Sequence, residues 1–119
     1  MKIKLGTLVN SKEALSKLIN DSGKIPTEKA WKLAKAIRKI EGELEDYEKV
    51  RIAKIKEYGK ENEDGSVRVE EKKMQSFQDD LNQILTKEIE IDMPDITAKD
   101  LGDKIELKVI LNLDWLIKE

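Results

Sequence analysis

The sequence predicts a mainly α-helical fold of the α+β class: a long helical hairpin with a short two-stranded β element near the termini. Residues 26–58 carry a long stripe of apolar side chains at helical spacing, and residues 69–87 carry a shorter one after a polar turn. Two segments near the termini, 2–5 and 89–93, alternate polar and apolar residues, and such short strands are stable only when paired. At 119 residues the chain is expected to form a single domain, 1–119.

The first long stretch begins with Pro26, which suits a first helical turn, and is followed by Gly59, which predicts a left-handed C-cap. An unbroken helix here is about 50 Å long, whereas a compact domain of this size is about 28 Å across. Part of the stripe must therefore meet a second long element or another chain, and we expect at least a dimer. The stripe residues are Leu33, Ile37, Ile40, Leu44 and Tyr47.

The elements around the long helix are predicted from capping and turn patterns. A short helix is expected over 11–20, with Asn10 as its N-cap. Asp64-Gly65 marks the tightest point of the next turn. The third helix, over 69–87, should then pack antiparallel on the C-terminal half of the long one.

The end of the chain supports two interpretations. Residues 97–100 have the composition of a capped turn. From 105 to 113 the apolar residues alternate as in a strand, yet those from 107 to 117 also share a helical face. We favour helix, and strand stays open. Trp115 and Leu116 belong to a segment too apolar for a free tail, so we expect both to be buried.

Composition excludes several classes of function. The chain has no Cys and no His, which removes thiol and imidazole catalysis and the usual zinc ligands. Charged residues make up 40 % of the chain but the net charge is only −2, unlike a general DNA-binding protein. We expect no enzymatic activity, no cofactor and no metal site. The chain has no long apolar run and no signal-peptide core, so we expect no membrane association and a cytoplasmic location.

A basic cluster on the first half of the long helix is the candidate binding site. A basic face beside an aromatic ring can hold phosphates and stack a base. Carboxylates follow directly, however, so the same cations can be solvated or can pair with acidic residues of a neighbouring helix or subunit. We favour the latter interpretation. The cluster consists of Trp31, Lys32, Lys35, Arg38 and Lys39, with Lys29 just before it.

Several short pieces, in order along the chain, carry a resemblance to a known family. They are Lys2-Ile3-Lys4, Lys32-Leu33-Ala34-Lys35, Glu57-Tyr58-Gly59, Asp64-Gly65, Phe77 and Leu113-Asp114-Trp115-Leu116-Ile117. Together they resemble short proteins encoded by phages and prophages of low-GC Gram-positive bacteria. The resemblance implies a viral or prophage origin and a host-cytoplasm setting, and that family brings no assigned activity and no catalytic residues.

The function expected from these observations is non-enzymatic. We expect a phage accessory protein that acts by protein–protein binding, self-associates through the long helix and engages a host or phage protein. The alternative is a nucleotide- or nucleic-acid-binding protein that uses the Trp31 and Lys32 helix face. The candidate contact residues include Trp115 and Leu116 besides the basic cluster.

Overall fold

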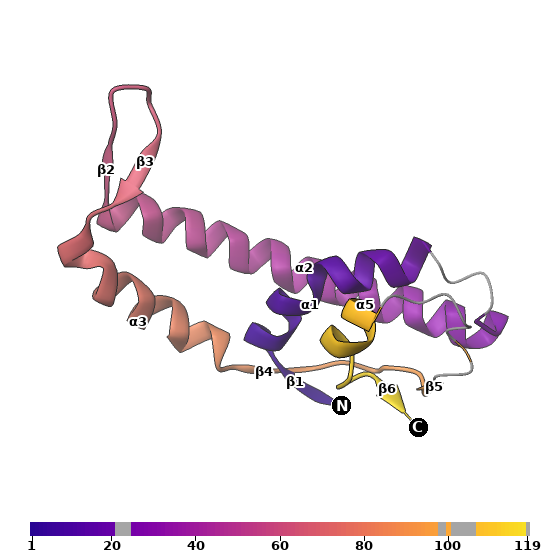
Figure 1. The fold of residues 1–119 in the computed structure, drawn as a ribbon. Helices are drawn as coiled ribbons and strands as arrows, with labels where there is room; N and C mark the ends of the chain where they lie inside the picture. The colour runs from indigo at the N-terminus through magenta and orange to yellow at the C-terminus, as the bar shows by residue number, and fades with distance from the viewer. Residues whose placement is uncertain (21–24, 98–99, 101–106, 119) are drawn as a thin grey trace.

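The computed structural model describes residues 1–20, 25–97, 100 and 107–118. The molecule is elongated, with extents of 50 × 28 × 21 Å, and its longest dimension follows one helix (Figure 1). Its radius of gyration is 17.3 Å, against about 13.5 Å for a compact domain of this length. In chain order the elements are β1 (Lys2–Lys4), α1 (Leu5–Asn20), α2 (Thr27–Tyr58), β2 (Gly59–Glu61), β3 (Val67–Val69), the 3-10 helix η2 (Glu71–Lys73), α3 (Met74–Leu85), β4 (Glu88–Glu90), β5 (Ile96–Thr97), α5 (Leu107–Asn112) and β6 (Ile117–Lys118).

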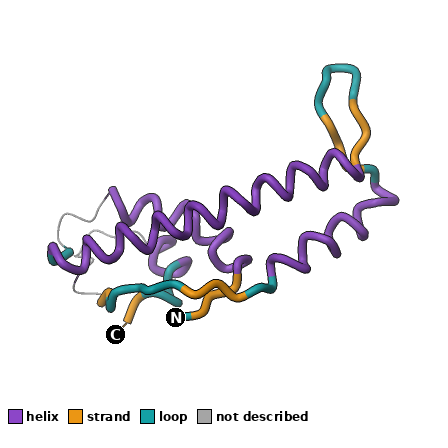
Figure 2. Tube along the Cα trace, turned by 180° about the vertical axis from the view of Figure 1, so that it is seen from behind, coloured by secondary structure: helices purple, strands orange, loops and turns teal. Residues whose placement is uncertain are grey.

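The predicted α+β class and helical hairpin are confirmed. Helix α3 returns along α2 from its C-terminal end, and β1 pairs antiparallel with β4 near the N-terminus (Figures 1 and 2). Ile3 lies opposite Ile89 in that pairing, as the alternating pattern predicted. A second antiparallel pair, β2–β3, forms a hairpin at the far end of α2, and β5 pairs parallel with β6.

The hydrophobic core lies at one end of the molecule, around the N-terminal half of α2. Helix α1, the segment after β4, and the chain from α5 to β6 surround this half. Helix α1 therefore covers the first part of the α2 stripe within the same chain, so the length of the stripe alone does not require a second chain. The most fully buried members of the core are Leu8, Leu18, Ile40, Ile91, Ile96, Leu113 and Leu116.

The rest of the molecule forms an arm, residues 45–85, made of the C-terminal half of α2, the β2–β3 hairpin and α3. Val69 and Leu81 are the two buried hydrophobic residues of this arm. Polar contacts help to hold its helices together. The Tyr58 hydroxyl donates to Asp80 Oδ2 over 2.6 Å, and Lys54 Nζ lies 3.3 Å from the same oxygen.

The prediction for the first helix was wrong at its start. Helix α1 begins at Leu5, six residues before the expected Ser11, so Asn10 lies inside the helix and is exposed. Leu5, Leu8, Ser11, Leu15 and Leu18 are all buried at helical spacing. Ser11 occupies one core position of this pattern. Because a serine interrupts the run of apolar residues, the sequence pattern indicates only the C-terminal half of the helix.

The prediction for the third helix was also wrong at its start. Residues 67–69 form β3, and the regular helix begins at Met74. Gly59 is extended, with φ −95° and ψ 166°, and does not adopt the predicted left-handed C-cap. It begins the hairpin instead, where a Cβ would lie 2.6 Å from Val67 Cγ1. The turn prediction at Asp64-Gly65 is confirmed, since Gly65 has φ +86°.

The tail is helical where the structure describes it, over Leu107–Asn112, and then forms turns and β6. Residues 105 and 106 lie outside the described part. Leu116 is buried as predicted, whereas Trp115 is half-buried. The indole Nε1–H of Trp115 donates to Ser11 Oγ over 2.9 Å, which fixes the tail to α1. The Ser11 hydroxyl in turn lies 2.7 Å from the Thr7 carbonyl oxygen, to which it donates.

Candidate binding surface

One side of α2, outside its buried stripe, carries most of the candidate residues. Its residues recur at steps of three and four, which places them on one side of a helix. All of them are exposed, although a core stripe runs along the opposite side. We call this surface the outer face: Trp31, Lys32, Lys35, Lys39, Gly42, Asp46 and Val50. At the edge of this side, Asp46 and Val50 also line a hollow with Leu5, Ile84 and Ile89.

The basic half of the outer face borders an open groove. Trp31, Lys32, Lys35 and Lys39 line it, together with Ala36 and Asp92. Asp92 follows β4, so the groove lies between α2 and the segment after that strand. The structure thus brings four of the five members of the basic cluster together and adds a carboxylate that sequence analysis did not assign to the site.

Internal contacts already engage two of the lysines. Lys35 Nζ lies 4.9 Å from the centroid of the Trp31 ring, a cation–π distance. Lys39 Nζ donates to the main-chain carbonyl of Glu90 and so ties α2 to β4. Both side chains stay exposed at the surface. Trp31 is 65 % exposed, so its ring surface remains available to a partner.

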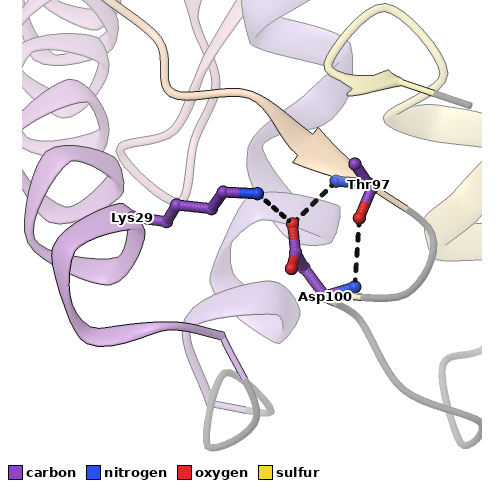
Figure 3. A network of polar contacts seen from close by, with 3 residues as sticks. All are labelled: Lys29, Thr97 and Asp100. Atoms are coloured by element: carbon purple, nitrogen blue, oxygen red, sulfur yellow. Dashed lines mark hydrogen bonds and ion pairs between the residues drawn. The ribbon is translucent and has the colours of Figure 1, made fainter.

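Lys29 is separate from this surface. Its Nζ lies 2.8 Å from Asp100 Oδ2, and the same oxygen accepts a hydrogen bond from the Thr97 backbone N–H at 3.0 Å (Figure 3). The Asp100 backbone N–H donates to Thr97 Oγ1, a capping contact between the two ends of the predicted turn, whose residues 98 and 99 lie outside the described part. The Lys29 ammonium and the hydrogen bonds from Thr97 hold the pKa of Asp100 below its usual value. This network joins the first turn of α2 to the chain after β5.

Some acidic residues in the C-terminal half of α2 form ion pairs with basic residues of the same helix. Glu45 lies 3.9 Å from Lys49, as the spacing predicted, and Glu48 pairs with Arg51. The hydrogen bond from Arg51 holds the pKa of Glu48 below its usual value. Neither Arg38 nor Asp46 has an ion-pair partner among the residues that the structure describes. Within those residues, no cluster of three or more acidic side chains is placed to hold a metal ion.

The two tail candidates do not join the basic cluster. Leu116 is 1 % exposed, and Trp115 packs against the core with its indole N–H bonded to Ser11. Neither lines the groove beside Trp31.

Comparison with protein-family models, curated protein sequences and solved structures found no match for this chain. No helix within the described residues is both long and apolar enough to cross a membrane.

Proposed function

We propose that this protein is a non-enzymatic accessory protein of phage or prophage origin that acts by protein–protein binding. It self-associates through the long helix and engages a host or phage protein in the host cytoplasm. The observation that carries the proposal is the outer face of α2, where Trp31 is 65 % exposed and Val50 is 40 % exposed. Large aromatic side chains on a surface are the residues that most often dominate the energy of a protein interface.

The experiment that tests this proposal compares two exposed apolar residues. Trp31→Ala should weaken self-association by roughly 30-fold or more, because a buried aromatic hot spot is worth about 2 kcal/mol or more. Leu111→Ala is the matched control, since Leu111 is 66 % exposed but lies on α5, away from the outer face. Sedimentation equilibrium gives the dissociation constant of each variant. Equal dissociation constants for the unmodified protein, Trp31→Ala and Leu111→Ala would show that the outer face is not part of the interface.

The groove beside Trp31 favours one alternative function, the binding of a nucleotide or single-stranded nucleic acid. Three lysines around an exposed indole provide charge for phosphates and a surface for stacking. Two observations oppose it: Lys35 already lies over the Trp31 ring, and Asp92 adds a negative charge to the groove.

Titration with a short oligothymidylate, followed by tryptophan fluorescence, separates the two functions. Protein binding alone predicts no saturable change. A nucleic-acid site predicts saturable binding that is lost when Lys32, Lys35 and Lys39 are all replaced with Gln. The salt dependence of any residual binding should then flatten by roughly the number of phosphate contacts removed.

A further inference from the structure

We propose that the partner on the outer face is a second copy of this chain, and that the two α2 helices pair antiparallel about a two-fold axis beside Gly42. This inference rests on the proposed self-association and specifies its geometry. A two-fold interface must be self-complementary, because the same surface meets itself in the opposite direction. The outer face, together with Arg38 and Glu45 beside it, meets that requirement in its shape, its charges and its exposed apolar side chains.

Gly42 lies at the middle of the helix and of the face. Fifteen residues of α2 precede it and sixteen follow it, so helices that cross there overlap along their whole length. Gly42 is exposed, and a Cβ built on it meets nothing within 4 Å. The absence of a side chain at this point lets two backbones approach closely.

The charges of α2 change sign at the same point. Lys35, Arg38 and Lys39 precede Gly42, and Glu45 and Asp46 follow it. In an antiparallel pair related by a two-fold axis, a side chain meets one on the same flank of the second helix, at about the same height on the other side of Gly42. At about 100° per residue, Arg38 and Glu45 share one flank and Lys39 and Asp46 share the other, so Arg38 lies near Glu45 and Lys39 near Asp46. In a parallel pair, each of these residues would lie against the same residue of the second copy, and the like charges would repel each other.

The exposed apolar residues of the face are also brought together. Trp31 and Ala53 both lie eleven positions from Gly42 and near its side of the helix, so the indole of one copy covers the exposed Ala53 of the other. Lys35 comes near Lys49 of the second copy, but Lys49 lies 3.9 Å from Glu45 of its own chain, which reduces this repulsion.

The β2–β3 hairpin fits the same arrangement. It leaves the C-terminal end of α2 on the side away from α3 (Figure 1). In the antiparallel pair, the end of α2 that carries each hairpin lies level with the N-terminal end of the α2 helix of the second copy.

Single cysteines test this geometry, because the chain has none of its own. Gly42→Cys places a thiol beside the two-fold axis, and mild oxidation should convert most of the protein into a disulfide-linked dimer. Lys56→Cys is the control: its side chain is exposed, and the antiparallel pair separates its two copies by about 40 Å along the helices. It should stay monomeric on a non-reducing gel.

Each of the other outcomes contradicts a stated part of the proposal. Crosslinking at both positions means a parallel pair and overturns the inference. A dimer in sedimentation without a crosslink at 42 means another interface, which overturns the inference and leaves self-association standing. A monomer in sedimentation overturns the proposed self-association as well.

A charge exchange provides an independent test. Arg38→Glu alone and Glu45→Arg alone each set like charges against each other twice per dimer, and each should raise the dissociation constant roughly tenfold. An equimolar mixture of the two variants should associate as tightly as the unmodified protein, since each contact then joins opposite charges. A mixture no tighter than either variant alone would contradict the antiparallel register.

Discussion

Replacing Leu116 with Ala tests how the tail supports the core. Leu116 is 1 % exposed and belongs to the core cluster together with Leu113. A buried Leu→Ala change costs about 2–5 kcal/mol, depending on how far the cavity collapses. With an unfolding entropy of about 2.1 cal/mol/K per residue, each kcal/mol lowers the Tm of a chain of this length by about 4 °C. The expected decrease is therefore about 8–20 °C.

The assay is thermal unfolding followed by circular dichroism, with Leu111→Ala as the matched control. Leu111 lies five residues earlier and is 66 % exposed, so the same chemical change there should alter Tm by about 2 °C or less. Deletion of residues 114–119 should destabilise the protein at least as much as Leu116→Ala. Equal Tm values for Leu116→Ala and Leu111→Ala would show that the tail does not pack on α1 and α2 as the structure has it.

Three further predictions concern single contacts. Gly65→Ala should lower stability by about 1–2 kcal/mol in urea unfolding, because Gly65 has φ +86° and alanine is strained there. Ser11→Ala should cost about 1–3 kcal/mol in the same assay, because the Trp115 indole N–H loses its acceptor in the core. The Tyr58 hydrogen bond holds the pKa of Asp80 below its ordinary value of 3.8, so this stabilisation is present above that pH and is lost as the pH falls through the lowered pKa. Asp80→Asn should therefore make Tm fall less steeply with acid below about pH 4, and an unchanged slope would contradict that role.

The elements that the sequence predicted well are those with local signals. Leu33, Ile37, Ile40 and Leu44 of the predicted α2 stripe are buried, so the helix and its buried side could be assigned from spacing. The first half of α1 was missed because Ser11 takes a core position, and its partners at Thr7 and Trp115 are known only once the tail is in place. The β2–β3 hairpin was missed because Val67–Val69 is too short to show a period, and its strand conformation comes from pairing with β2.

The candidate surface was predictable only in part. The spacing of Lys32, Lys35 and Lys39 placed them on one side of a helix, and the structure confirms that they line one groove. Sequence spacing does not show which chain segment lies beside a helix. For that reason, only the structure shows that Asp92 lines the groove. It also shows that Lys29 pairs with Asp100 instead of joining the basic cluster.

The outer face of α2 is proposed to join two copies of the chain. Size-exclusion chromatography with multi-angle light scattering tests this pairing most directly, at tens of micromolar protein and low salt, where surface charge pairs are least screened. Pairing of two chains predicts a molar mass of twice the 13.7 kDa of one chain, falling toward the monomer value on dilution. A mass of 13.7 kDa at every concentration up to about 100 μM would contradict it.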